Sequence, residues 1–218
     1  MGFGFKTPKV VQQRGTLPIM RKNPWRKLQA PHAKQKLPSL SAGSQSKGEM
    51  KILQLNLNHC RAAQDLLAQT VRALKIGLAI LSEPYASKHD GIWFQNSQGG
   101  ASIWSCSPRP LQIQCRHSGR GFVRAKVGSL TIYSCYIAPS VDSQTFGSIV
   151  DDILEDARGR HPIIIAGDFN AWATEWGSRL TNHRGHILLA RSGLTLANTG
   201  TANTYEKAGM GSVMTSRS

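Results

Sequence analysis

The chain has 218 residues, 40% of them hydrophobic, and a formal net charge of +15 at pH 7. This length and apolar content allow one domain with a real core plus an appendage, and no apolar run is long enough to span a bilayer. So large a positive charge is typical of a protein with a polyanionic partner, either nucleic acid or an anionic membrane surface.

The cysteines and the N-terminus indicate an intracellular protein. The four cysteines show no Cys-x-x-Cys spacing, and no Cys/His cluster has the spacing of zinc ligands. We therefore predict that the cysteines are reduced and structural. The N-terminus is basic but lacks the apolar segment of a secretory signal.

Residues 1–49 are predicted to form a disordered basic leader. They contain ten Lys or Arg, one acidic residue and five prolines, and they show no apolar periodicity. Two interpretations of this leader stay open. It can be a solvated linker, or it can be an arm that binds phosphates without sequence specificity.

Apolar patterning begins at Met50 and predicts three elements in succession. Alternation over residues 50–57 predicts a strand, and apolar residues at helical spacing predict an amphipathic helix over 61–75. The apolar run over 78–83 predicts a second buried strand, which closes on a single carboxylate, Glu83.

The next part of the chain predicts an antiparallel meander followed by a helix. Short apolar runs alternate with turn signals at the spacing of consecutive strands. The predicted strands are 91–94, 101–105, 111–116, 121–127 and 130–137. Asp142 or Ser143 can cap the helix that follows.

The stretch from His161 to Asn170 is the centre of the predicted fold. Three successive isoleucines, 163–165, predict a strand buried on both faces. This strand leads to Asp168 and Asn170, whose side chains point the same way if the segment stays extended. The alternative is an ordinary polar turn after a strand.

A helical pattern over 185–192, a last strand over 194–197 and a disordered tail over 206–218 complete the predicted chain. The order of elements predicts a mixed α/β (α+β) fold in which helices cover sheets. The first domain boundary lies at residue 50 and the second at about residue 205.

Three predicted strand ends deliver polar residues, namely Asn56 with Asn58, Glu83, and Asp168 with Asn170. If these ends meet at one sheet edge, they form an acidic, amide-rich cleft. Hard oxygen ligands of this kind suit Mg²⁺ or Mn²⁺ better than zinc, and such a metal acts as a Lewis acid on a phosphodiester. The competing interpretations are a strand-end Glu83 paired with a basic residue and a simple turn amide at Asn56.

Four motifs, in this order and spacing, resemble the endonuclease/exonuclease/phosphatase superfamily. They are Gln-Leu-Asn56-Leu-Asn58, Leu-Ser-Glu83-Pro, Cys-Tyr136-Ile-Ala-Pro and Ile-Ala-Gly-Asp168-Phe-Asn170-Ala. Within the superfamily, the run Gly-Asp-Phe-Asn-Ala-Trp-Ala-Thr-Glu-Trp-Gly-Ser resembles the apurinic-type endonuclease domain of insect non-LTR (LINE-type) retrotransposons. The resemblance covers roughly residues 50–205.

The resemblance implies a DNase I-like four-layer sandwich of two mixed β-sheets flanked by helices. It also implies Mg²⁺-dependent nicking of target DNA, which leaves a 3′-hydroxyl to prime reverse transcription. By motif position, Glu83 would be the principal metal ligand with Asn56 helping it. Asp168 would align or deprotonate the attacking water.

The resemblance assigns the remaining site residues to the substrate. Tyr136 would contact the region of the scissile phosphate, and Asn170 would bind the phosphate. Asn58 and Thr204 would lie near the substrate. His59 is expected to be a packing residue instead of a ligand.

The chain departs from the family after Thr204. The family's Ser-x-Ile-Asp segment and Ser-Asp-His strand end have no counterpart in residues 211–218. We therefore expect a C-terminally truncated domain whose last strands are missing, with an open sheet edge. In the family, the histidine of the Ser-Asp-His end stabilises charge on the phosphate. Loss of such a stabiliser of the transition state lowers the rate about 100–1000-fold.

Three functions consequently stay open at the level of sequence. The first is a DNA endonuclease, impaired by the truncation, and the second is a catalytically inert retroelement fragment that binds DNA by charge alone. The third is a superfamily phosphatase that acts on a small phosphoester. For the favoured endonuclease we expect a monomeric nuclear protein with DNA as partner, Mg²⁺ or Mn²⁺ as cofactor and no membrane association.

Overall fold

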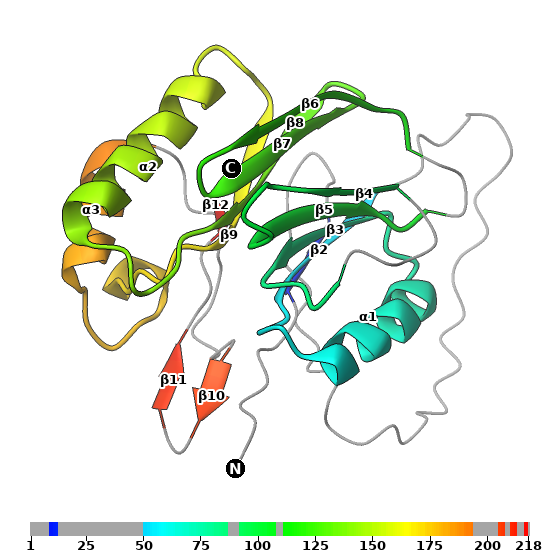
Figure 1. The fold of residues 1–218 in the computed structure, drawn as a ribbon, viewed down its shortest axis with the longest axis horizontal. Helices are drawn as coiled ribbons and strands as arrows, with labels where there is room; N and C mark the ends of the chain where they lie inside the picture. The colour runs from blue at the N-terminus through cyan, green and yellow to red at the C-terminus, as the bar shows by residue number, and fades with distance from the viewer. Residues whose placement is uncertain are drawn as a thin grey trace, which may run out of the picture.

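The computed structural model describes residues 9–12, 50–86, 92–107, 111–193, 205–207, 210–212 and 216–217. Two five-stranded sheets face each other, with helices on their outer sides (Figure 1). Helix α1 covers one sheet, and α2 and α3 cover the other. This arrangement confirms the predicted sandwich of two mixed sheets flanked by helices.

The first sheet has the strand order β1-β2-β3-β5-β4. Strands β2 and β3 are parallel, whereas the other neighbours are antiparallel. The elements of this half are β1 Lys9–Gln12, β2 Lys51–Asn56, α1 Arg61–Leu74, β3 Leu78–Ser82, β4 Ile92–Gln95 and β5 Ala101–Ser105.

The second sheet has the order β12-β9-β8-β7-β6, and β8 and β9 are its parallel pair. Its elements are β6 Ile113–Gly119, β7 Phe122–Val127, β8 Leu130–Tyr136, α2 Ser143–Ala157, β9 Ile163–Asp168, α3 His183–Ser192 and β12 Ser216–Arg217. A short 3-10 helix (Thr174–Trp176) precedes α3, and β10 Tyr205–Lys207 pairs with β11 Met210–Ser212.

Strand alternation explains how the layers hold together. In β2, Ile52 packs between the two sheets, whereas Leu53 and Leu55 pack under α1. In β9, Ile164 belongs to the layer between the sheets. Its neighbour Ile165 packs under α2 and α3 on the other face. Both strands are therefore buried on both faces, as their apolar runs predicted.

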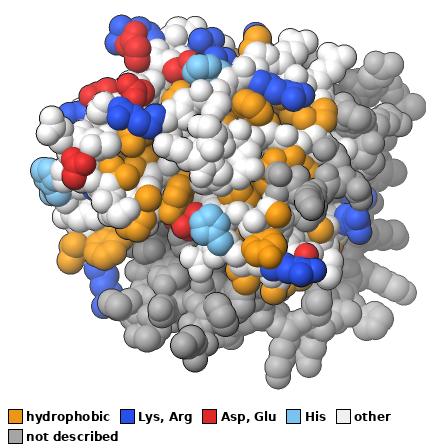
Figure 2. Space-filling view, in the orientation of Figure 1, with side chains coloured by type: hydrophobic (Ala, Val, Ile, Leu, Met, Phe, Trp, Pro, Cys, Tyr) orange, Lys and Arg blue, Asp and Glu red, His pale blue; other side chains and the backbone are white. Residues whose placement is uncertain are grey.

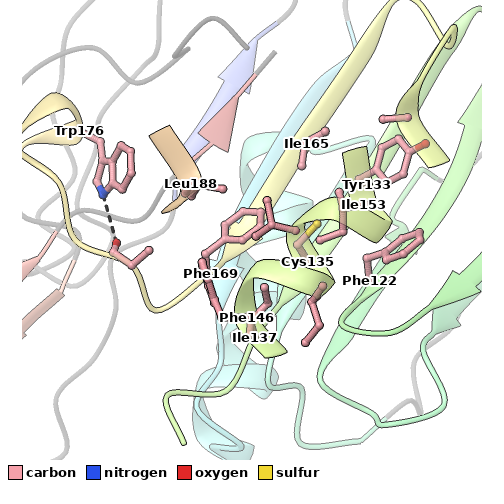
Figure 3. Packing of buried hydrophobic residues seen from close by; sticks show 14 of the residues in the cluster. Phe122, Tyr133, Cys135, Ile137, Phe146, Ile153, Ile165, Phe169, Trp176 and Leu188 are labelled. Carbon is pink, nitrogen blue, oxygen red and sulfur yellow. Dashed lines mark hydrogen bonds between the residues drawn. The ribbon is translucent and has the colours of Figure 1, made fainter. Parts of the chain in front are cut away.

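Helix α2 anchors the outer face of the second sheet. Its residues Phe146 and Ile153 lie in one buried cluster with Cys135 and Ile165 of the strands (Figure 3). Asp142 caps the helix, because its side chain accepts a hydrogen bond from the Thr145 N–H at 2.9 Å. Strands β8 and β9 both pack against this helix, so the helix stabilises the position of the last residues of the two strands.

The predicted meander is wrong in one respect, because its strands belong to two sheets. Strands β4 and β5 join β3, whereas β6, β7 and β8 form the second sheet with β9. Turn signals look alike whether the next strand pairs locally or crosses to another sheet, so the pattern did not reveal this partition.

The structure describes three short strand pairings in or beside the stretches predicted as leader and tail. Strand β1 pairs with β2, β10 pairs with β11, and β12 pairs with Ala166 and Ile165 of β9. The pairing of β12 covers part of the edge that was expected to be open. Unpaired backbone N–H and C=O groups on an edge strand can pair with any extended segment. Such a pairing does not require an apolar pattern in the segment, so the sequence did not predict it. The predicted strand 194–197 lies outside the described residues.

Among the residues that the structure describes, no helix combines the length and the apolar character needed to cross a membrane.

Candidate active site

The two parallel strand pairs bring four polar residues to the same end of the sandwich. In the first sheet, Asn56 at the end of β2 pairs with Ser82 at the end of β3, directly before Glu83. In the second sheet, Tyr136 at the end of β8 pairs with Asp168 at the end of β9. Each sheet thus presents the carboxyl ends of two neighbouring strands.

Two side-chain hydrogen bonds join these strand ends across the sheets. Asn56 Nδ2 donates to Asp168 Oδ2 at 2.7 Å, and Tyr136 OH donates to Glu83 Oε1 at 2.6 Å. Asn56 and Asp168 are buried, with 3% and 8% of their surfaces exposed. The predicted convergence of the glutamate, aspartate and asparagine side chains is therefore present in the fold.

A seam of buried polar contacts lies behind this site. Gln54 Nε2 donates to the Gly167 carbonyl at 3.1 Å, and the Ser82 hydroxyl donates to the Cys135 carbonyl at 3.2 Å. Gly167 is required here, because a Cβ at this position, with φ at +151°, would collide with the Cys135 carbonyl oxygen. These contacts hold β2 and β3 in register with β8 and β9 immediately below the site.

The chain turns after Asp168 instead of continuing as an extended segment, as in the alternative of a polar turn after the strand. Asn170 has a left-handed backbone, with φ at +49°. Its N–H donates to Asp168 Oδ1 at 3.0 Å, and its Nδ2 donates to the Ile137 carbonyl at 3.0 Å. The turn keeps Asn170 beside Asp168 while its amide reaches the loop after Tyr136.

Asn58 and Thr204 differ in what the structure says of them. Asn58 is exposed at the rim of the site, and its N–H donates to Asn56 Oδ1 at 2.7 Å. That contact fixes the Asn56 amide so that its nitrogen faces Asp168. Thr204 lies outside the described residues.

His59 is a neighbour of the site that sequence reasoning missed. Its side chain is 63% exposed, so it is not the packing residue that was expected. Its Nε2 lies 3.8 Å from Glu83 Oε1, and its Nδ1 lies 3.2 Å from the Pro84 carbonyl oxygen. The signal that could have found it is its position one residue after Asn58, at the end of a strand parallel to the one that ends before Glu83.

Four residues of the site share a left-handed backbone. Asn58, His59, Glu83 and Asn170 all have φ between +48° and +50°. Non-glycine residues adopt this conformation rarely, and such positions cluster at functional sites. Each of the four lies within the turn that follows a strand.

Tyr136 is held in its protonated form. Burial raises the pKa of its phenol, and the hydrogen bond to Glu83 with the negative charges of Glu83 and Asp168 raises this pKa further. A protonated phenol donates its hydrogen bond to Glu83 and so orients that carboxylate. The ring fits because residue 100 is glycine, since a Cβ there would lie 2.5 Å from Tyr136 Cδ1.

The donor set fits a hard divalent cation with few protein ligands. Within the described part of the chain, no group of three or more His, Cys, Asp or Glu side chains could hold a metal ion. Mg²⁺ needs less than that, because it keeps several waters and binds through one or two carboxylates plus substrate phosphates. Glu83 and Asp168, which the cross-sheet hydrogen bonds bring to the same end of the sandwich, supply that number of carboxylates.

The comparisons with known proteins agree with this geometry. Residues 130–214 match the model of a family described as endonuclease-reverse transcriptase. A comparison with curated protein sequences gave no match.

Among solved structures, the fold is similar to the endonuclease domain of TRAS1, a telomere-specific non-LTR retrotransposon. The TM-score is 0.67 at 23% identity, covering 77% of this chain and 83% of that chain. It is also similar to NExo, a 3′-5′ exonuclease from Neisseria meningitidis, with a TM-score of 0.52 at 16% identity, covering 67% and 72%.

A further similar structure is described as the 3′ phosphatase NExo from Neisseria bound to product DNA hairpin, with a TM-score of 0.51, 15% identity and the same coverage. The chain therefore has a DNase I-like fold, and the family match over residues 130–214 together with this fold confirms the resemblance to retrotransposon endonucleases that the sequence motifs indicated.

Proposed function

We propose that this chain is the metal-dependent endonuclease domain of a non-LTR retrotransposon, which nicks target DNA and leaves a 3′-hydroxyl to prime reverse transcription. The observation that carries the proposal is the pair of cross-sheet hydrogen bonds, Asn56 to Asp168 and Tyr136 to Glu83. They gather the motif residues of four strand ends at one place, as a phosphodiester-cleaving site requires.

Glu83 would hold Mg²⁺ or Mn²⁺, with the Asn56 carbonyl oxygen nearby. When bound there, the cation supplies Lewis-acid stabilisation of charge on the phosphodiester oxygens. Tyr136 keeps the Glu83 carboxylate in one orientation through its hydrogen bond. The carboxylate is also partly shielded, because only 15% of the Glu83 side chain is exposed.

Asp168 would position and deprotonate the attacking water. Its two oxygens already accept hydrogen bonds, Oδ2 from Asn56 and Oδ1 from the Asn170 N–H, so the carboxylate cannot rotate freely. A fixed acceptor near a reacting water is what general-base catalysis needs. Asn170 and Asn58 would add neutral hydrogen-bond donors that bind a phosphate without repelling it.

The charge of the chain supports DNA as the substrate, because a net charge of +15 favours association with a polyanion. On the face drawn in Figure 2, the Lys and Arg side chains lie at several separate places, some beside acidic groups. Nonspecific attraction over a wide surface therefore fits better than one continuous basic groove on this face. We extend the proposal to a monomer that acts in the nucleus, where its DNA target lies.

The test is a time course of supercoiled-plasmid nicking with Mg²⁺. Wild-type protein should nick, and Glu83→Gln, which keeps the shape of the side chain, should reduce the rate about 100-fold or more. Glu155→Gln, the same change on the exposed face of α2, is the matched control and should nick as wild type does. Equal rates for the Glu83 variant and wild type would overturn the proposal.

The nick's 3′ end tests the priming role. A DNA polymerase should extend it directly, because a 3′-hydroxyl needs no processing. An end that is extended only after phosphatase treatment would contradict that role.

Two other functions have a specific observation in their favour. The net charge alone would support an inert DNA-binding protein. In that case, DNA binding should weaken steeply as the salt concentration rises, and neither the wild type nor any variant should nick DNA. The similarity to a 3′ phosphatase would support removal of a 3′-phosphate. A 3′-phosphorylated oligonucleotide that is dephosphorylated faster than plasmid is nicked would favour it.

A further inference from the structure

The strongest unassigned feature of the molecule is the pairing of His59 with Glu83 at the rim of the site. His59 Nε2 lies 3.8 Å from Glu83 Oε1. Two ligand atoms on one cation at bond lengths of about 2.1 Å lie about 3 Å apart when adjacent and about 4.2 Å apart when opposite. The observed separation is longer than the adjacent spacing, so both atoms bind one ion in adjacent positions once the exposed imidazole moves about 0.8 Å closer to the carboxylate.

The other ring nitrogen identifies which atom of His59 is available. Its Nδ1 lies 3.2 Å from the Pro84 carbonyl oxygen. A carbonyl oxygen only accepts hydrogen bonds, so the hydrogen lies on Nδ1 and, in the neutral ring, Nε2 carries a lone pair. A histidine that donates one N–H to a backbone carbonyl and offers the other nitrogen is the usual arrangement around a protein-bound metal.

The backbone holds the two residues in this position. Both have a left-handed φ, +50° at His59 and +48° at Glu83. The His59 N–H donates to the Glu83 carbonyl at 2.8 Å, which ties the two turns together. Tyr136 OH donates to the same Glu83 oxygen, Oε1, which keeps its second lone pair for a cation.

The ring is also reachable from solvent. The His59 side chain is 63% exposed, whereas that of Glu83 is 15% exposed. The competing explanation is an exposed histidine–glutamate ion pair, which would contribute little to stability. The two explanations differ in whether His59 Nε2 binds a metal ion.

We propose that His59 Nε2 is a ligand of the cation held by Glu83, which gives the site a preference for a divalent transition-metal ion over Mg²⁺. Imidazole nitrogen binds transition metals well, whereas Mg²⁺ takes oxygen ligands. The inference rests on the metal site of the proposed function. It goes further, because it assigns a nitrogen ligand and a metal class to that site.

The direct test is pulsed EPR of Mn²⁺ bound to the full chain. Wild type should show electron spin echo modulation from one directly bonded nitrogen, and His59→Gln should lose it. His186→Gln, an exposed histidine on α3, is the matched control and should keep the modulation. Bound Mn²⁺ without nitrogen modulation in wild type, or with unchanged modulation in the His59 variant, would overturn the inference.

Calorimetric titration adds the selectivity. His59→Gln should weaken Mn²⁺ binding by at least the roughly 10-fold that loss of a hydrogen-bonding partner of a metal ligand costs, and change Mg²⁺ binding much less. Equal losses for both ions, or no Mn²⁺ binding by wild type, would also overturn the inference.

The proposed function is judged separately, by Mg²⁺-dependent nicking and its loss in Glu83→Gln. Nicking without a nitrogen ligand refutes only the inference. A nitrogen-coupled Mn²⁺ site without nicking refutes only the function.

Discussion

Replacing Asn56 by aspartate would set two carboxylates against each other where the two sheets meet. In the wild type, the Asn56 amide donates to Asp168 Oδ2 at 2.7 Å, and both residues are buried. At that separation, two full charges repel by about 6 kcal/mol with an effective dielectric constant of about 20. Such a penalty corresponds to more than about 4 pH units, so the folded variant should keep one shared proton at neutral pH.

The free energy of unfolding of Asn56→Asp should depend on pH, because the folded variant holds a proton that the unfolded chain releases. In the unfolded chain both carboxyls ionise near pH 4, at about their reference pKa of 3.9. In the folded variant the upper pKa of the carboxyl pair is raised, so stability is present below about pH 4 and is lost as pH rises. The free energy of unfolding should fall by about 1.4 kcal/mol per pH unit, or about 2–3 kcal/mol between pH 5 and pH 7.

Urea denaturation at these two pH values measures this loss. Asn58→Asp is the matched control, because it adds the same charge to an exposed side chain two residues away. It should change with pH as wild type does. If Asn56→Asp shows no greater pH dependence than the control, the contact between Asn56 and Asp168 does not join the sheets and the reasoning fails.

Three further substitutions test other parts of the site. Gly167→Ala would clash with a neighbouring backbone carbonyl and should lower the free energy of unfolding by more than about 4 kcal/mol. Gly128→Ala has open space around it and should lower it by only about 1–2 kcal/mol, so similar thermal shifts for the two variants would contradict the clash. Asn182→Ala removes two hydrogen bonds at the start of α3 and should lower the free energy of unfolding by about 1–2 kcal/mol; an unchanged denaturation midpoint would count against it. Tyr136→Phe should change stability by about 1 kcal/mol but slow nicking about 10–100-fold, because the glutamate of the site loses its orienting donor; full activity would exclude that role.

The parts of the fold that the sequence predicted are those with dense apolar pattern. Strand β2 and helix α1 were predicted within a residue of their observed bounds, because the strand is buried on both faces and the helix on one. The same holds for β9, whose three isoleucines are buried on both sides. The pattern of apolar residues along the sequence predicts which residues are buried, so these elements can be found without coordinates.

What the sequence left open depends on backbone geometry and on distant pairing. The left-handed turns at Glu83 and Asn170 follow from contacts with other loops, and composition leaves no mark of them. The contact between His59 and Glu83 joins residues 24 positions apart through two such turns. The sheet to which β4 and β5 belong was also hidden, since local turn signals do not specify the partner strand.

Metal binding at Glu83 can be observed in a crystal of the protein soaked in Mn²⁺ and measured at a wavelength where manganese scatters anomalously. We expect an anomalous peak about 2.1 Å from a carboxylate oxygen of Glu83. A crystal whose Mn²⁺ lies elsewhere while Glu83 carries none, under conditions in which the same protein nicks DNA, would contradict it.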